Sequence, residues 1–178
     1  NRYGTPALAD FDHDGDLDLY ESDGNGANRL FLNEGRGVFT RVTGSSPELT
    51  NEAVRTSGSV FADVDGDGDL DLYVVNWGAA NRLYRNEQND DRYLKLHLRG
   101  TVSNADAIGA TVRVSRAGKL VGVRAVGTLS GFCTQPPLDL HFGLPEAGLY
   151  RVDVRFPSGM TFTGDYSSGQ AVTITEGR

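Results

Sequence analysis

The sequence has little of what cross-links a small domain or carries a chain through a membrane. Its 178 residues include a single cysteine, Cys133, which excludes an intramolecular disulfide and leaves a redox or cysteine-zinc role unsupported. No apolar run approaches the roughly 20 residues that cross a bilayer, so we expect no membrane insertion. A chain of this length can bury about 70% of its unfolded surface and needs no disulfide cross-links to fold.

Positive charge and candidate catalytic groups are also scarce. Lysine and arginine total 17 against 24 aspartates and glutamates, a net charge of −7, which argues against nucleic acid as a partner. The three histidines, His13, His97 and His141, have no recurring acid or nucleophile nearby in sequence. We interpret His97 and His141 as structural, expect His13 to be exposed, and predict that the protein is not an enzyme.

Helical periodicity is absent as well. Glycine is frequent, with 23 residues, and no apolar stripe of period 3.6 lasts for three turns. Short alternating or β-branched segments between turn residues predict an all-β fold. The expected strands are Thr5–Phe11, Leu17–Ser22, Arg29–Asn33, Val38–Val42, Gly58–Val64, Leu70–Asn76, Arg82–Asn86, Tyr93–Arg99, Thr111–Val114, Leu120–Val126, Leu138–Phe142, Tyr150–Phe156, Met160–Phe162 and Ala171–Thr175.

What the chain does contain is an internal repeat. Ala9–Tyr20 reads A-D-F-D-H-D-G-D-L-D-L-Y, and Ala62–Tyr73 reads A-D-V-D-G-D-G-D-L-D-L-Y, at an offset of 63 − 10 = 53 residues. The offset persists without a gap, because N-R-L-F at residue 28 returns as N-R-L-Y at residue 81, and N-E at 33 returns at 86. Each copy is one supersecondary unit that cannot bury its apolar face alone.

Five carboxylates within nine residues repel one another, so each loop needs a cation. Oxygen donors favour calcium or magnesium over zinc, and calcium, which accepts six to eight oxygens, fits so many carboxylates better. By analogy with known calcium loops, side chains and one backbone carbonyl would hold each of two ions, which changes the net charge to −7 + 4 = −3. The expected side-chain ligands are Asp10, Asp12, Asp14, Asp18, Asp63, Asp65, Asp67 and Asp71, and the expected carbonyl ligands are Asp16 and Asp69. Gly15 and Gly68 would turn the chain at positive φ.

Two other interpretations of the loops are weaker. A plain solvated turn needs one or two such residues, not five in register twice. An EF-hand would place a bidentate glutamate at the twelfth position, where the first loop has Glu21 but the second has Val74. Strand-like flanks also argue against the helices of that motif.

The repeated unit resembles the FG-GAP or VCBS type of repeat, which is found in integrin-like β-propellers and many secreted bacterial proteins. The resemblance lies in the pattern D-x-D-x-D-G-D-x-D-L followed by N-R-L-F/Y-x-N-E. The resemblance covers about the first half of the chain and implies calcium binding in the loop. It also implies two propeller-blade-like repeats.

The second half resembles the ASPIC/UnbV domain, which commonly follows such repeats in the cartilage acidic protein-like family. The residues that carry the resemblance are Ser103-Asn104, Ala107–Ala110, Leu140–Leu144, Val154–Gly159 and Val172–Glu176, while Gly127–Gln135 departs from the family's pattern. The family has no established catalytic residues to transfer. Seven alternating strands there predict an antiparallel β-sandwich. Polar Asn89-Asp90-Asp91 places the expected boundary between domains 1–90 and 91–178.

These features predict a secreted or cell-surface, non-enzymatic calcium-binding module for adhesion or self-assembly, because two repeats cannot close a ring and leave open faces. We expect self-association, as a head-to-tail oligomer or filament subunit, or another extracellular protein as the partner. The alternatives are a module that binds carbohydrate or a protein ligand, and a fragment of a larger integrin-like β-propeller protein. We interpret Trp77 as an anchor of its loop, with sugar stacking as the rival.

Overall fold

The structure, a computed structural model, describes residues 4–43, 49, 54–127 and 134–177. Each predicted strand has a counterpart there, which confirms the all-β fold class. The strands are β1 Gly4–Ala9, β2 Asp18–Asp23, β3 Arg29–Asn33, β4 Phe39–Arg41, β5 Thr56–Ala62, β6 Asp71–Asn76, β7 Arg82–Tyr84, β8 Tyr93–Arg99, β9 Thr111–Arg116, β10 Lys119–Ala125, β11 Leu140–Gly143, β12 Leu149–Arg155, β13 Thr161–Ser167 and β14 Gln170–Thr175.

The chain forms two compact units. The first holds residues 1–11, 16–88 and 129–136, and the second holds residues 12–15, 89–128 and 137–178. The predicted boundary between residues 90 and 91 stays a prediction that expression of the separate halves would test. The departure at Gly127–Gln135 lies largely outside the described residues, as do Cys133 and most of the segment between the two repeat copies, residues 44–57. In the part of the chain that the structure describes, no helix has the length and apolar character to cross a membrane.

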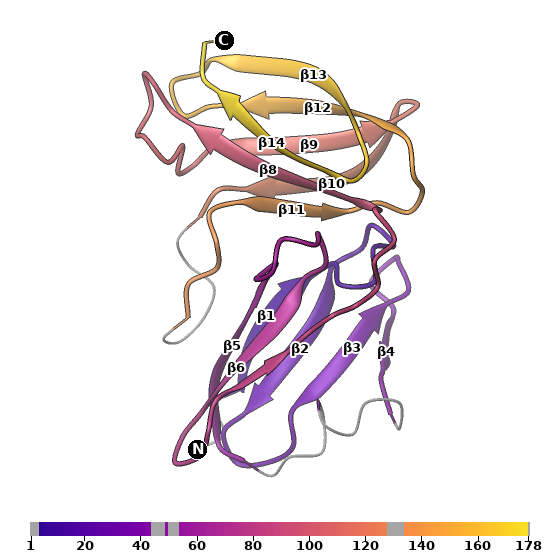
Figure 1. Cartoon of the computed structure of the whole chain (residues 1–178), viewed down its shortest axis with the longest axis vertical. Helices are drawn as coiled ribbons and strands as arrows, with labels where there is room; N and C mark the ends of the chain where they lie inside the picture. The colour runs from indigo at the N-terminus through magenta and orange to yellow at the C-terminus, as the bar shows by residue number, and fades with distance from the viewer. Residues whose placement is uncertain (1–3, 44–48, 50–53, 128–133, 178) are drawn as a thin grey trace. The chain divides into compact units, whose positions relative to one another are not determined.

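Two antiparallel sheets, one from each repeat copy, build the first unit. The first copy forms the sheet β1-β2-β3-β4 and the second forms β5-β6-β7. Figure 1 shows β5 and β6 lying over β1 and β2, and an apolar cluster between the sheets contains Tyr20, Leu30, Leu72 and Val74. Each copy is therefore a small blade that buries one face against the other copy.

The second copy has one strand fewer than the first. In the first sheet β4 pairs with β3, through Leu32 opposite Thr40. At the 53-residue offset the counterpart of β4 is residues 92–94, of which Tyr93 and Leu94 belong to β8 of the second unit instead. The second sheet consequently ends at the three-residue strand β7.

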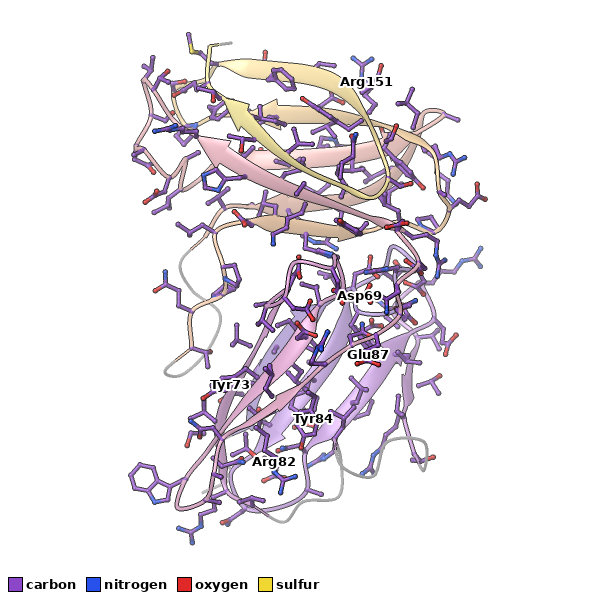
Figure 2. The ribbon with its side chains drawn as sticks, viewed as in Figure 1. Asp69, Tyr73, Arg82, Tyr84, Glu87 and Arg151 are labelled. Carbon is purple, nitrogen blue, oxygen red and sulfur yellow. The ribbon has the colours of Figure 1, made fainter. Side chains whose placement is uncertain are left out.

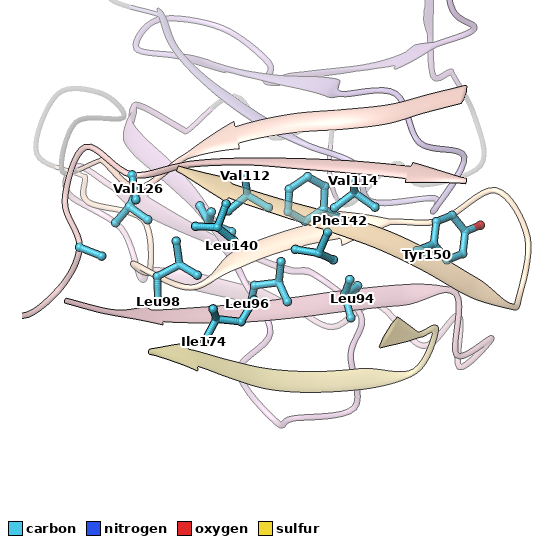
Figure 3. Close-up of a cluster of buried hydrophobic side chains, with 14 of the residues drawn as sticks. Leu94, Leu96, Leu98, Val112, Val114, Val126, Leu140, Phe142, Tyr150 and Ile174 are labelled. Atoms are coloured by element: carbon cyan, nitrogen blue, oxygen red, sulfur yellow. The ribbon is translucent and has the colours of Figure 1, made fainter. Parts of the chain in front are cut away.

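The second unit is a sandwich of the sheets β10-β9-β12-β13 and β11-β8-β14. Its pairing is antiparallel except for β14, which runs parallel to β8 with Ile174 opposite Leu98. Figure 3 shows Leu94, Leu96 and Leu98 of β8 facing the opposite sheet, where Val112 and Val114 of β9 are fully buried. Alternation of buried and outward positions along β8 and β12 creates this core.

A buried carboxylate ties together distant segments of this sandwich. Glu176 accepts hydrogen bonds from the backbone amides of Thr101, Val102 and Ser103, and from the hydroxyls of Ser103 and Ser158. Burial alone would raise the pKa of the Glu176 carboxyl, but the bonds from Ser158, Ser103 and Thr101 outweigh burial and hold that pKa far below its ordinary value of 4.5.

Candidate metal centre

The second acidic loop connects β5 to β6 and gathers three carboxylates. Ligand atoms of Asp63, Asp65 and Asp71 all lie within 4.8 Å of one another. The corresponding residues of the first loop, Asp10, Asp12 and Asp18, form a matching group within the same limit. Both groups use positions one, three and nine of the loop, so the 53-residue repeat holds in three dimensions as well as in sequence.

The backbone of the two loops turns where the sequence predicts. Gly15 has φ of 99° and Gly68 has φ of 97°, which confirms the positive φ expected at the sixth position. Position four also lies at positive φ, with 60° for His13 and 82° for Gly66. A non-glycine residue pays a steric cost in this region, so glycine is the less strained residue at position four.

Asp18 and Asp71, at position nine, each tie the start of the loop to the chain at the end of the third strand of the same repeat copy. The backbone amides of Phe11 and Asn33 donate to the two oxygens of Asp18, at 3.1 and 2.9 Å. In the second copy Val64 and Asn86 donate to the two oxygens of Asp71, at 3.0 and 2.9 Å. Both aspartates are buried. We name each of these arrangements the carboxylate clamp of its loop.

The other predicted ligands lie outside the two groups. Asp14 is exposed, and its amide donates to Asp12 at 3.3 Å, as the amide of Asp67 does to Asp65. Asp69 is buried, whereas Asp16 is exposed. A hydrogen bond from the Asp69 amide lowers the pKa of the Asp67 carboxyl, but burial and the nearby charges of Asp65 and Asp69 raise it above its ordinary value.

The second loop has a basic neighbour at a position where the first copy has a leucine. The guanidinium of Arg85 is hydrogen-bonded and ion-paired to Asp65. The residue 53 positions earlier is Leu32, so the repeat places no arginine at the equivalent site. Because Asp65 belongs to the carboxylate group, Arg85 and a cation compete for the same oxygens.

The donor set fits calcium. Both groups consist of carboxylate oxygens alone, within reach of a single ion, and neither contains a thiol or an imidazole. Hard oxygen donors in a loop with adaptable geometry match the preference of calcium over zinc. Asp10, Asp12 and Asp18 would hold one ion and Asp63, Asp65 and Asp71 the other.

Two expectations about single residues are wrong. His13, predicted to be exposed, is fully buried, because its Nδ1 lies 2.9 Å from Asp90 Oδ1 and its ring stacks on that of His141. Trp77, interpreted as an anchor of its loop, has a side chain that is 73% exposed, while its backbone amide donates to the Arg55 carbonyl at 2.7 Å. His97 meets expectation in pairing with Asp139 at 2.8 Å.

The sequence did not predict the role of the asparagines, which form hydrogen bonds with backbone amides in each repeat copy. Asn28 accepts from the Asp23 amide at 2.8 Å, and Asn81 accepts from the Asn76 amide at 3.0 Å. The N-R-L-F/Y-x-N-E signature has two asparagines in each copy. The first, Asn28 or Asn81, accepts this backbone bond, and the second, Asn33 or Asn86, donates its amide to the carboxylate clamp. Their recurrence at the same offset was the available signal, but it does not reveal what an asparagine binds.

Comparison with known proteins confirms the resemblance found in the sequence. Residues 10–74 match the FG-GAP-like repeat family, and residues 100–178 match the ASPIC and UnbV family. Cartilage acidic protein 1 from Homo sapiens is 28% identical over 184 aligned residues, covering 97% of this chain and 27% of that protein. The protein of the same name from Xenopus tropicalis is 27% identical over 97% of this chain and 28% of its own length. The chain thus spans about a quarter of the length of these relatives.

Proposed function

We propose that this chain, in which FG-GAP-like repeats precede an ASPIC and UnbV domain, is an extracellular structural module for adhesion or self-assembly that two calcium ions stabilise. The observation that carries the proposal is the pair of matching carboxylate groups, Asp10 with Asp12 and Asp18, and Asp63 with Asp65 and Asp71. Two copies of one arrangement at a fixed offset indicate a shared ligand rather than two unrelated acidic turns.

Electrostatics supports the proposal. Ten of the 24 acidic residues lie in the two loops. A hydrogen bond from the Asp69 amide lowers the pKa of the Asp67 carboxyl, but burial and the charges of Asp65 and Asp69 raise that pKa above its ordinary value. A divalent cation relieves this repulsion. Calcium loops of moderate affinity suit the millimolar calcium outside cells, and the matching relatives are named for cartilage, a tissue largely made of extracellular material.

The proposed role is non-enzymatic. In the calcium-bound form the loop carboxylates stay ionised and coordinated. They are therefore poor general acids or bases. Calcium would neutralise the carboxylates in the turn between β1 and β2 and in the turn between β5 and β6, and so stabilise both blades. The module would then present its sheet faces and loops to a partner.

Isothermal titration calorimetry tests the calcium sites. We expect two ions per wild-type chain and one in each of the variants Asp12→Asn and Asp65→Asn, with none in the double variant. These positions are chosen because Asp18 and Asp71 also hold the backbone. Asp106→Asn, at an exposed aspartate of the second unit, is the matched control and should retain both ions. Unchanged stoichiometry in the double variant would refute the assignment, and stronger binding of magnesium would refute the choice of ion.

Carbohydrate binding is a second candidate, favoured by the exposure of Trp77. An exposed indole ring offers an apolar face on which a sugar can stack. Binding of a glycan that Trp77→Ala abolishes, while calcium binding is retained, would favour this role over self-assembly.

A further inference from the structure

We propose that Asn25 is a site of spontaneous deamidation, at which the first repeat copy converts to aspartate and isoaspartate as the protein ages. Asn25 lies in the turn between β2 and β3, residues 24–28, and Gly26 follows it. It is the only asparagine of the sequence that precedes a glycine. The inference concerns a reaction of the chain itself and does not depend on the proposed calcium sites.

The reaction needs only water. The backbone nitrogen of Gly26 loses its proton to hydroxide and attacks the side-chain carbon Cγ of Asn25. The bond between Cγ and the side-chain nitrogen breaks, and ammonia leaves with a proton from water, so that a cyclic succinimide remains. Water then opens the ring. Attack at Cγ gives aspartate with an ordinary backbone, whereas attack at the backbone carbonyl gives isoaspartate, whose backbone runs through the former side chain.

The local structure leaves the reacting atoms accessible. Asn25 is exposed, and among the described residues neither its side chain nor the Gly26 amide takes part in a hydrogen bond. The Asn25 backbone amide donates to Asp23 Oδ1 at 2.9 Å, which holds the residue in the turn. Gly26 has no Cβ to hinder the approach of its nitrogen to Cγ. Cyclisation therefore breaks no hydrogen bond of the reacting groups.

Asn104 has the opposite arrangement, although it is also exposed. Its side-chain oxygen accepts from the Ile108 amide at 2.8 Å, and its side-chain nitrogen donates to the Ile108 carbonyl at 2.9 Å. Ala105, which follows it, carries a Cβ. Both hydrogen bonds would have to break before the ring could form, so we expect Asn104 to react more slowly. Asn104 is therefore an internal control for Asn25.

The second repeat copy has a different pair of residues at the equivalent turn. At the 53-residue offset Asn25 and Gly26 correspond to Gly78 and Ala79. Their turn ends where Arg82 begins β7 (Figure 2). Because glycine has no side-chain amide, this turn cannot undergo the reaction. Deamidation would thus make the two copies less alike with time.

The products add a negative charge where the turn already has two. One terminal nitrogen of Arg29 lies 2.9 Å from Asp23 Oδ2, and the other lies 3.4 Å from Glu21 Oε2. A carboxylate at residue 25, whose own amide binds Asp23, would be a third acid beside one guanidinium. Like charges repel at this range, so the turn of the deamidated chain should be less stable.

Isoaspartate has a second effect, because it adds one carbon to the backbone of the turn. The same turn positions Asn28, whose side-chain nitrogen donates to the Thr56 hydroxyl at 3.0 Å. That hydroxyl donates to Asn76 Oδ1 at 3.1 Å. Asn28 and Thr56 are buried, and they connect the first repeat copy to the second. Displacing Asn28 would leave buried polar groups unsatisfied, so we expect isoaspartate to destabilise the first unit.

Peptide mapping by tandem mass spectrometry tests the proposal on the intact chain, stored with calcium at body temperature. We expect the Asn25 peptide to gain the mass difference between an amide and a carboxyl group and to separate into two products. Endoproteinase Asp-N, which does not cut before isoaspartate, distinguishes them. A change from neutral to mildly alkaline pH should speed the conversion severalfold, because hydroxide removes the Gly26 proton. An Asn25 peptide that converts no faster than the Asn104 peptide would overturn the proposal.

Asn25→Gln is the matched variant, because glutamine keeps the amide but would have to close a larger ring. After equal storage the wild type should melt at a lower temperature than when fresh, whereas Asn25→Gln should be unchanged. Conversion with no change in melting would refute the effect assigned to Asn28. Calorimetry on fresh protein separates this inference from the proposed function. Deamidation of a chain that binds no calcium would support the Asn25 site and refute the calcium sites.

Discussion

The two units bury different kinds of side chain. Among the described residues, the second unit has one cluster of 16 buried apolar residues, whereas the corresponding cluster of the first unit has four. Among the described residues the first unit instead buries aspartates, including Asp10, Asp18, Asp69 and Asp71. Apolar burial stabilises a fold without a ligand, but buried carboxylates need neutralisation or hydrogen bonds. The comparison indicates that one unit supplies its own stability and the other depends on its loops.

Removing calcium should have the largest effect on this difference. At a free concentration of a hundred times the dissociation constant, each ion stabilises the first unit by about 2.7 kcal/mol, so a chelator should lower its melting temperature strongly. Residues 91–178 expressed alone should fold and melt at the same temperature with or without chelator. Calorimetric melts of the whole chain and of that half provide the measurement. A chelator-sensitive second half would remove the distinction between the units.

Replacing Glu176 should weaken the second unit, though less than calcium removal weakens the first. Glu176→Gln keeps the shape but removes the charge that the amides of Thr101, Val102 and Ser103 bind. The folded-state pKa of Glu176 is depressed, because hydrogen bonds outweigh the opposing effect of burial, so its contribution is fully present above pH 4.5 and is lost as the pH falls below that value.

Urea unfolding of wild type and Glu176→Gln between pH 7 and pH 3 measures this dependence. The difference between the two proteins should be greatest at pH 7 and shrink below pH 4.5. Asp165→Asn, at an exposed position of β13, serves as the control. A difference that stayed constant across this range would show that the Glu176 charge contributes nothing.

The smallest expected effect distinguishes the two acidic loops from each other. Arg85→Leu places in the second copy the residue that Leu32 provides in the first, and removes the guanidinium from Asp65. We expect the second site to bind calcium a few-fold more tightly, while the first is unchanged, because an exposed ion pair is worth at most about 1 kcal/mol. Titration in the Asp12→Asn background isolates the second site, and equal or weaker binding there would contradict competition by Arg85.

Local pattern was enough to predict the strands and the loop turns. Alternation along Tyr93–Arg99 gave β8 with its observed bounds, and the repeated D-G pair placed positive φ at Gly15 and Gly68. Pairing partners were not accessible in the same way. Alternation states which face of a strand is buried but not which strand lies beside it, so the parallel pairing of β14 with β8 could not be foreseen.

The residues that the sequence misjudged depend on contacts distant along the chain. His13 is buried through Asp90, which lies 77 positions later, and Glu176 binds amides more than 70 positions earlier. The carboxylate groups were predictable because their members lie within nine residues. Asp18 and Asp71 illustrate the limit, since spacing placed them near an ion but not between two backbone amides.

The carboxylate clamps have a consequence for how an ion would enter and leave. Each clamp already joins the start of its loop to the chain at the end of β3 or just after β7, through two backbone amides. Ion binding therefore orders little additional backbone. The conformational entropy of the loop is lost when the chain folds, not when the ion is coordinated. Such a loop can exchange its ion rapidly without losing strand register, so occupancy can follow the surrounding calcium concentration while the blade remains assembled.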